Sequence, residues 1–333
     1  MFIVESYGVA VALCFLTMLC WGSWGNTQKL ASQEWPFQLF YWDYSIGVPL
    51  LALLLAFTLG STGDAGRAFI PDITQASGQA IAMALLGGAV FNFANLLLVV
   101  AIDIAGMAVA FPVGIGLALV IGVIANYDPG QVSNAFLLFL GVGLVVLAIA
   151  VDALIYRRIP SEGNSQVGKG LVISIICGIA MGFFYRFVAQ SMSLDFANPE
   201  PGLMTPYSAA VVFGIGLLLS NIIFLVPLMY KPITGEPASL GSYFSQGTPR
   251  LHLVGMLGGA IWATGFCFNI IAAGEAGYAV SYGLGQGATM VAAFWGIFIW
   301  KEFKDAPSGT GGWIAAMFGF FFVGLGMIIY SNL

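Results

Sequence analysis

Ten long apolar stretches take up most of this chain and decide what it can fold into. Each has about 18 residues or more, and a helix of that length, rising about 1.5 Å per residue, crosses the ~30 Å hydrocarbon core of a bilayer. They cover residues 7–29, 36–60, 79–101, 105–126, 133–156, 169–190, 204–230, 252–273, 277–300 and 310–331. Only 8% of the residues are charged, against about 25% in soluble domains. The sequence therefore predicts an all-α integral membrane protein with ten transmembrane helices.

The basic residues predict which way this bundle faces. Those flanking the connections on one side are Lys29, Arg157, Arg158, Lys169, Lys231, Arg250, Lys301 and Lys304, whereas only Arg67 lies clearly on the other side. Cytoplasmic loops carry the excess of Lys and Arg, so we expect a multi-pass protein of the bacterial inner membrane with both termini outside. Glu5 precedes the first stretch and no Lys or Arg does, which favours a retained helix over a cleaved signal peptide.

The chain contains an internal repeat. Residues 86–125 align without a gap with residues 257–296, and 12 of these 40 positions are identical. The repeat predicts two halves, residues 1–158 and 159–333, with five stretches each. Because five is odd, the second half enters the membrane from the opposite side. Inverted repeats of this kind are an architecture of secondary transporters, which alternate between two shapes around a site near mid-membrane.

Several short motifs carry a family resemblance. The sequence Cys20-Trp-Gly-Ser-Trp-Gly25 and the Gly/Ala-rich hairpin at 101–116 resemble the drug/metabolite transporter superfamily. The Trp-Gly-Ser motif is similar to the bacterial glucose/ribose porters, and the hairpin with Leu140-Gly-Val-Gly143 is similar to the rhamnose-proton symporters. Val4-Glu-Ser6 and Trp42-Asp-Tyr-Ser-Ile46 instead resemble the ureide permeases. The first likeness implies a sugar as substrate, and the second implies allantoin-like ureides and nucleobases.

Polar and aromatic side chains near mid-depth are the candidates for binding a substrate. Amides supply donors and acceptors, and aromatic rings supply flat surfaces, which together suit an uncharged polyhydroxylated or heterocyclic compound. The alternative is that they make interhelical hydrogen bonds and ordinary packing contacts, which we favour for Trp24 and Tyr278. The candidate binding residues are Trp21, Asn92, Asn95, Trp262, Tyr282 and Gln286.

Four charged residues within or next to the stretches are candidates for gating or coupling, because charges buried in a membrane are costly and usually functional. Asp43 lies about 10 Å from the cytoplasmic end of its helix, by the helical rise. We expect it either to carry a coupling proton or to close the inner mouth as an ion pair with Lys29. Arg186 and Glu275 are expected near the outer mouth. The alternative is that all four only reach for the headgroup region.

The sequence lacks the residue patterns of an enzyme, a metal site or a nucleic-acid-binding protein. The four cysteines form no CxxC pair, and the only histidine, His252, is expected to be solvated at a helix start. We therefore predict no enzyme activity, no metal and no cofactor beyond a coupling ion, H⁺ or Na⁺. Ten basic residues in a chain of net charge −5 exclude nucleic acid as a partner.

These observations predict a secondary transporter, monomeric or homodimeric, for a small neutral polar metabolite. A sugar is the first expectation for the substrate. A ureide or nucleobase is the alternative, and export of drugs or amino acids is third.

Overall fold

The computed structural model describes residues 1–333 except 33, 106, 159–166 and 305. All regular structure in this part is helical, apart from one bridge between Met192 and Met204. The longer helices are α1 (Tyr7–Ser23), α3 (Phe37–Phe57), α5 (Gly78–Ala105), α6 (Met107–Asn126), α7 (Ala135–Tyr156), α8 (Val167–Ser191), α9 (Pro206–Ser220), α12 (Pro249–Ala276) and α15 (Thr310–Tyr330). The shorter ones are α2 (Gly25–Ala31), α4 (Phe69–Gln75), α10 (Leu225–Tyr230), α11 (Leu240–Gln246), α13 (Tyr278–Gly285), α14 (Ala288–Phe294) and the π-helix η1 (Trp295–Ile299).

Nine helical segments of the described chain are long and apolar enough to cross a membrane, which confirms an integral membrane protein. They coincide with nine of the ten expected stretches, with α1–α2, α9–α10 and α13–η1 each counting as one crossing. The tenth stretch corresponds to α6, whose described apolar part, Pro112–Asn126, is shorter than a full crossing. The expected boundary between the halves, at 158/159, borders a segment outside the described residues.

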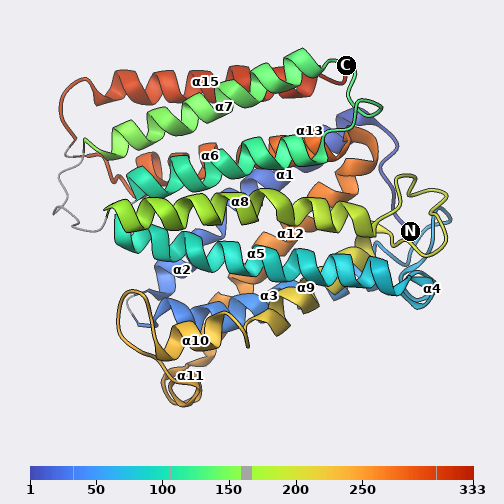
Figure 1. Ribbon diagram of the computed structural model, residues 1–333, viewed down its shortest axis with the longest axis horizontal. Coiled ribbons are helices and arrows are strands. Elements are labelled where there is room, and N and C mark those ends of the chain that lie inside the picture. The colour runs from blue at the N-terminus through green and yellow to red at the C-terminus, as the bar shows by residue number, and fades with distance from the viewer. Residues whose placement is uncertain (33, 106, 159–166, 305) are drawn as a thin grey trace.

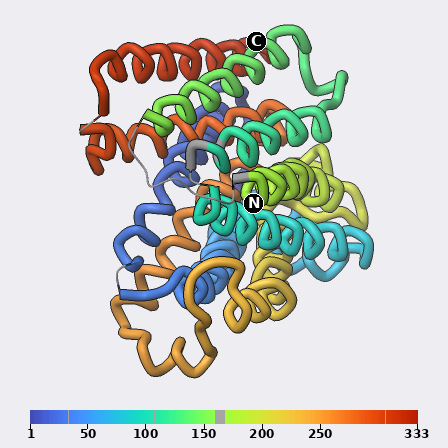
Figure 2. Tube along the Cα trace, turned by 60° about the vertical axis from the view of Figure 1, so that its left-hand side comes forward, coloured from blue at the N-terminus to red at the C-terminus, as the bar shows by residue number. Residues whose placement is uncertain are grey.

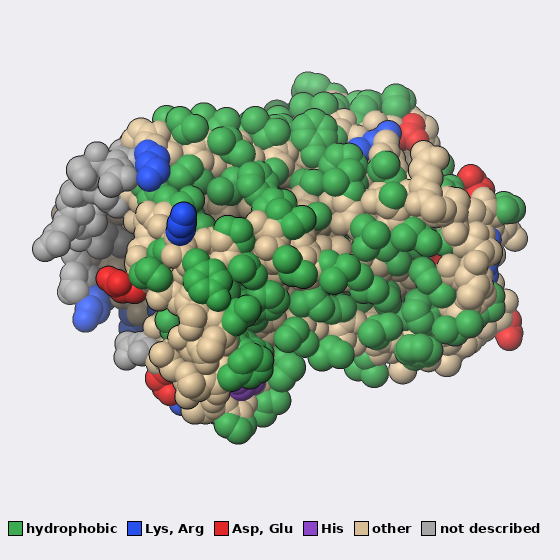
Figure 3. Space-filling view, turned by 60° about the horizontal axis from the view of Figure 1, so that its bottom comes forward, with side chains coloured by type: hydrophobic (Ala, Val, Ile, Leu, Met, Phe, Trp, Pro, Cys, Tyr) green, Lys and Arg blue, Asp and Glu red, His purple; other side chains and the backbone are tan. Residues whose placement is uncertain are grey.

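The long helices run side by side, so the molecule has two ends (Figure 1). Both chain termini lie at one end, together with α4; we call it the terminal end. The opposite end, called the basic end, holds α2, α10 and α11 (Figure 1). Hydrophobic side chains cover the middle of the face shown in Figure 3, and charged side chains gather toward the two ends. This distribution is what a bilayer around the middle of the bundle requires.

Local sequence signals explain where several helices begin. Ser6 accepts a hydrogen bond from the Val9 N–H at the start of α1, and Asn134 does the same for α7. Thr248 caps α12, whose first residue is a proline. Each cap satisfies one of the backbone donors that the first turn of a helix leaves free.

Glycines allow the helices to pack at backbone distance. A side chain on Gly47 of α3 would overlap the Met256 carbonyl oxygen of α12, and one on Gly259 of α12 would overlap the Tyr44 carbonyl oxygen of α3. The contact between α5 and α9 depends on Gly88 and Gly216 in the same way. α7 and α15 lie next to each other along one edge of the bundle (Figure 2). Small residues at such contacts are typical of membrane helix bundles.

Some crossings are interrupted near their middle. Between α13 and α14, Gly287 donates to the Leu284 carbonyl and Met290 donates to the Gly287 carbonyl, so the helix tightens into 3₁₀-type turns around Gln286. α1 and α2 meet at Trp24, and α9 and α10 are separated by four turn residues, 221–224. Interrupted helices within membrane depth are tolerated where the backbone lines a cavity or is buried in protein.

A buried ion pair joins the connections at the terminal end. Arg67 lies 3.1 Å from Asp72 Oδ1, and Arg67 also donates to the carbonyls of Pro199 and Leu203. The other carboxylate oxygen of Asp72 accepts from both the backbone N–H and the hydroxyl of Thr205, the residue that precedes α9. This network ties α4 to the start of α9.

Candidate functional site

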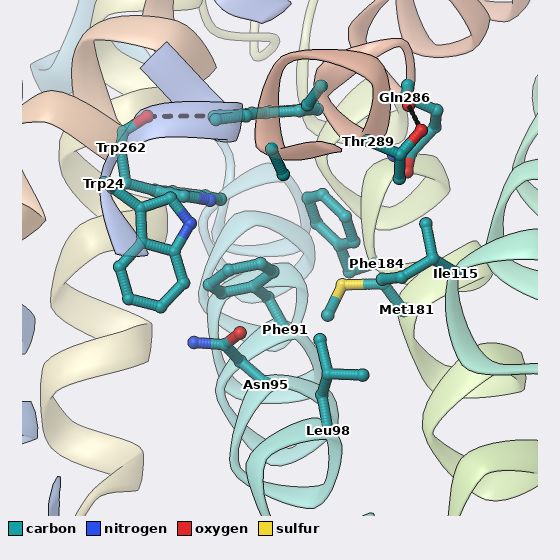
Figure 4. Close-up of a pocket in the computed structure, with 13 residues that line it drawn as sticks. Trp24, Phe91, Asn95, Leu98, Ile115, Met181, Phe184, Trp262, Gln286 and Thr289 are labelled. Atoms are coloured by element: carbon teal, nitrogen blue, oxygen red, sulfur yellow. Dashed lines mark hydrogen bonds between the residues drawn. The ribbon is translucent and has the colours of Figure 1, made fainter. Parts of the chain in front are cut away.

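A cavity of about 140 Å³ lies between the helices of the bundle (Figure 4). None of the residues that line it is charged. They come from both halves of the chain: Trp21, Trp24, Phe91, Asn95, Leu98, Ile115, Met181, Phe184, Trp262, Gln286, Ala288, Thr289 and Ala292. A cavity of about 150 Å³ holds a single benzene-sized ring. This cavity therefore suits one small ring and excludes disaccharides and most drug-sized molecules.

Aromatic rings form one wall of the cavity. The ring of Trp262 stacks on Trp21 with a centroid distance of 5.8 Å, and it lies 4.3 Å from the ring of Phe91. The Trp21 indole N–H donates to the Trp262 carbonyl, which fixes the two tryptophans relative to each other. Phe184 contacts Phe91 edge-on. The wall is thus rigid and presents ring faces against which a flat ligand can lie.

Two carboxamides supply the polar groups. Asn95 of α5 donates to the Tyr41 hydroxyl at 3.1 Å, and its side-chain oxygen accepts no hydrogen bond from the described residues. Gln286 lies at the break between α13 and α14, and within the described chain its side chain makes no hydrogen bond. An amide with free donor and acceptor atoms can pair with a ligand that presents the complementary N–H and C=O edge. Gln286 is the clearest such group in the cavity.

The structure brings together four of the six sequence-predicted binding residues: Trp21, Asn95, Trp262 and Gln286. The other two do not line the cavity. Asn92 donates to the Leu217 carbonyl, Ser220 and Asn221, at the interruption between α9 and α10. Tyr282 is fully buried and donates to the carbonyls of Ala118 and Met181. Both make hydrogen bonds between helices, as in the alternative given above, and a binding role for them stays a prediction.

Sequence reasoning missed other cavity residues. Trp24 was expected to be a packing residue, yet it lies beside the cavity one turn after Trp21 (Figure 4). Met181 and Phe184 on α8 are also three residues apart, and both line the cavity. The signal that could have found Trp24 is its position three residues from Trp21, which puts both on one side of the helix.

A wider vestibule of about 360 Å³ adjoins the cavity on the side of the basic end. The two spaces share Trp24, Asn95, Leu98 and Ala292. The outer part of the vestibule is lined by residues such as Asn26, Lys29, Trp300 and Glu302. The vestibule therefore leads from the cavity toward the basic end.

The expected ion pair between Lys29 and Asp43 is wrong. Lys29 Nζ lies 2.7 Å from Glu302 Oε1 and 4.2 Å above the ring of Trp300. Asp43 is 1% exposed, and no ion pair among the described residues joins it to Lys29. The charge on Lys29 is instead neutralised by Glu302, which no sequence pattern links to it.

Asp43 has two other partners. Tyr243 of α11 donates its hydroxyl to Asp43 Oδ1 at 2.5 Å, and His252 Nδ1 lies 2.9 Å from Asp43 Oδ2. We expected His252 to be solvated. The structure instead makes it part of a part-buried hydrogen-bonded group. Burial and the hydrogen bond to Asp43 raise the pKa of the Tyr243 phenol well above its usual value, so Tyr243 stays a donor. The group joins α3, α11 and α12 at the basic end.

The two outer candidates do not meet. Arg186 on α8 is exposed, and no ion pair among the described residues joins it to Glu275. Glu275 lies at the end of α12 beside Gln131 and Asn332, where it borders a surface hollow. No direct contact between Arg186 and Glu275 therefore supports their expected role as an outer gate.

An apolar multi-helix bundle with a cavity at interrupted crossings is the architecture of a membrane transporter. The comparisons with known proteins agree. The family model for ureide permeases matches residues 40–169 and 156–331, and the chain belongs to the ureide permease family.

The relatives extend this picture. Ureide permease 1 of Arabidopsis thaliana is 22% identical, with 100% of this chain and 99% of that protein covered. A probable glucose uptake protein, GlcU of Priestia megaterium, is 24% identical over 61% of this chain and 63% of its own length. A crystal structure with a TM-score of 0.62 covers 97% of this chain and 96% of its own at 15% identity, and shows a shared fold. The curated relatives named here are a permease and a probable uptake protein.

Proposed function

We propose that the protein transports a small, uncharged, flat compound with amide or ureide groups, such as an allantoin-like ureide or a nucleobase. The observation that carries this proposal is the cavity itself: one ring in size, free of charged groups, walled by Trp21 and Trp262, and holding the unpaired amide of Gln286. Membership of the ureide permease family supports the same substrate class.

The sugar that the sequence first suggested is less well supported. A sugar presents a hydroxyl on nearly every carbon, whereas the cavity offers only Asn95, Gln286 and Thr289 as polar side chains. The Thr289 hydroxyl already donates to the Gln286 carbonyl. An amino acid would bring two charges, and no charged side chain lines the cavity to meet them. The relative named as a glucose uptake protein keeps sugar as the second candidate.

We propose that ten crossings form two inverted repeats, residues 1–158 and 159–333. Helix contacts support this pairing. α5 packs against α8 and α9, and α12, which repeats α5, packs against α1 and α3. α6 packs against α8, and α13 and α14, which repeat α6, pack against α1.

Side-chain pairs support the same two-fold relation. Phe91 and Trp262 are equivalent in the repeat and contact each other in the aromatic wall of the cavity. Ile115 and Gln286 are equivalent and both line it. Gly141 and Gly324, which belong to matching Phe-x-Gly-x-Gly motifs in α7 and α15, each abut the other's carbonyl oxygen. Contacts between equivalent residues are what an axis through the cavity produces.

We further propose an orientation with both termini outside a bacterial cell membrane, since the basic end carries most of the Lys and Arg residues. In that orientation the vestibule opens toward the cytoplasm, so the structure corresponds to an inward-facing shape. Arg186 and Glu275 would then lie at the outer side, where their role as gating residues stays a prediction.

Uptake into proteoliposomes tests the substrate class. We expect allantoin and uracil to enter, and glucose and rhamnose to enter far more slowly under the same driving force. Transport of glucose alone would overturn the proposal in favour of the sugar reading.

Removing the Gln286 amide should weaken substrate binding. We expect Gln286→Ala to lower affinity about 5- to 150-fold, because one unmade hydrogen bond to a buried ligand costs about 1–3 kcal/mol. Isothermal titration with the transported compound measures this. Asn126→Ala is the matched control, since Asn126 is an amide on α6 outside the cavity. Equal loss in both variants would contradict the site assignment.

For Asp43, we propose the role of a latch that holds α11 onto α3 and α12. Asp43→Asn removes the charge from two hydrogen bonds, and bonds to charged groups are worth about 1.5–3 kcal/mol each. Hydrogen exchange of the α11 backbone amides should therefore accelerate at least about tenfold. Glu34→Gln, which alters an exposed pair with Arg250, serves as the control.

Two outcomes would contradict the latch. Unchanged exchange in α11 would mean that Asp43 does not hold it. Loss of uphill accumulation with substrate exchange preserved would instead make Asp43 the carrier of the coupling proton, which was the other expectation from the sequence.

A further inference from the structure

A polar network crosses the mouth of the vestibule, apart from the cavity. Glu302 stands at its centre: Lys29 Nζ lies 2.7 Å from Oε1, and the Tyr156 hydroxyl donates to Oε2 at 3.1 Å. Lys29 belongs to α2, Tyr156 ends α7, and Glu302 follows η1. Three crossings are thus tied together at the point where the vestibule opens.

The backbone that delivers Glu302 to this point is unusual. α14 passes into the π-helix η1, and Lys301, next to Glu302, has a φ of 54°, the only positive value for a non-glycine residue in the described chain. Gly296 of η1 accepts the Glu302 N–H, and a Cβ there would come within 3.0 Å of Glu302 Oε2. π-helical turns and left-handed non-glycine residues persist mainly where function requires the geometry.

Behind Glu302 lies a second carboxyl group, Asp152. It is 8% exposed, and its Oδ1 is buried with no hydrogen-bond partner among the described residues. Asp152 stands one turn before Tyr156 on α7, so it lies on the side of the helix from which Tyr156 contacts Glu302.

No ion pair among the described residues reaches Asp152. The helices packed against α7 are α6 and α15, and neither contains Asp, Glu, Lys, Arg or His. On α7 itself and just beyond it, Tyr156 is bound to Glu302, and Arg158 is held over the ring of Trp313. Lys29, the nearest basic group in the network, is paired with Glu302. An ionised Asp152 would be a buried, unpaired charge beside a second carboxylate, which is strongly unfavourable, so Asp152 is held as the neutral acid in this shape.

We propose that Asp152 is the site that binds the coupling proton, and that the Lys29–Glu302 ion pair senses its charge. The proposal rests on the transport function proposed above. In the inward-facing shape a proton occupies a carboxylate oxygen of Asp152, and Glu302 alone holds Lys29. When that proton leaves to water in the vestibule, two negative charges face Lys29 and draw α2 toward α7 and η1. Proton binding thereby changes the free energy of closing the vestibule mouth.

Asp152→Asn tests this directly, because an amide imitates the neutral acid and cannot release a proton. In proteoliposomes with an imposed pH gradient, we expect the wild type to accumulate substrate and the variant only to equalise its concentration on both sides. Exchange of internal for external substrate should persist and lose its pH dependence. Asp152→Glu should restore accumulation. Glu34→Gln, at the same end of the bundle but outside the network, should leave accumulation unchanged.

A second measurement does not require the substrate to be known. After a step from alkaline to acidic pH, the purified wild-type protein should take up one more proton per chain than Asp152→Asn, as reported by a pH-indicator dye. If no tested compound is transported, the proposed function fails while this difference still decides the proton site.

Several results would overturn the inference: equal proton uptake by the two proteins, uphill accumulation by Asp152→Asn with normal pH dependence, or accumulation driven by a sodium gradient at equal pH. Should Asp152→Asn fail to fold, Glu302→Gln replaces it. The same loss of accumulation with retained exchange is then expected, and full accumulation would overturn the proposal.

Discussion

Asp72→Ala should destabilise the protein more than any substitution at its surface. The change removes the carboxylate that pairs with Arg67 and accepts two hydrogen bonds from Thr205. Asp72 is fully buried, and breaking a buried pair by removing one partner costs about 3–5 kcal/mol. We expect the lower part of this range, since Arg67 keeps some contact with water. Equilibrium unfolding in detergent measures the loss.

The exposed pair between Glu34 and Arg250 provides the control. Its side chains are 52% and 67% exposed, and pairs of this kind contribute about 0–1 kcal/mol. Glu34→Ala should therefore leave the free energy of unfolding almost unchanged. If the two variants lost similar stability, the network between α4 and α9 would not be an important support of the fold.

Gly259→Leu should separate α3 from α12. Even the first side-chain carbon would overlap the Tyr44 carbonyl oxygen and lie 3.1 Å from the Gly47 Cα, so the helices have to move apart. Overpacking costs about 1–3 kcal/mol and occasionally more. We expect the upper end or beyond, because the obstacle is backbone and cannot change its rotamer. The fraction of monodisperse protein after extraction and the unfolding midpoint both report the effect.

The proposed inverted repeat adds a second half to this prediction. Gly88→Leu, at the equivalent position, would overlap the Phe213 carbonyl oxygen of α9 and should cost about as much as Gly259→Leu. Gly143→Leu is the control, because no atom lies within 4 Å of a Cβ at that exposed helical position. Unequal losses at Gly88 and Gly259 would argue against the two-fold relation.

The crossings and the depth of the site could be predicted from the sequence because they depend on local patterns. Hydropathy alone placed nine helices, and counting residues from the helix ends placed Trp21, Asn95, Trp262 and Gln286 at similar depth. The same counting could not fix which way each side chain faces.

Asn92 and Tyr282 show why orientation was harder. Asn92 and Asn95 are three residues apart, which in a helix of 3.6 residues per turn leaves a rotation of about 60°; Asn95 lines the cavity, and Asn92 bonds to the end of α9. Tyr282 stands four residues before Gln286, a spacing that puts two side chains on one face of a continuous helix, but α13 ends at Gly285. A break that depends on tertiary packing leaves little trace in the hydropathy pattern.

The partners of the buried charges depended on contacts between the halves. Asp43 and His252 are 209 positions apart, and Lys29 and Glu302 are 273 apart. Both Asp43 and His252 stand near the basic ends of their crossings, so equal depth was a usable signal for that pair. The position of Glu302 next to Lys29 depends on the π-helix η1 and on the left-handed backbone of Lys301. No sequence pattern predicts either feature.

The proposed repeat makes the two halves contribute unequal groups to the cavity. Trp262 contacts its counterpart Phe91, and Gln286 occupies the place that Ile115 has in the other half. Two identical halves would offer a ligand two equal ways to lie, related by the axis. Here the amide of Gln286 has an isoleucine as its counterpart, so an unsymmetrical molecule has a single preferred pose. In the transport function proposed above, the same inequality gives the inward-facing and outward-facing shapes different intrinsic free energies, even without a ligand or a gradient.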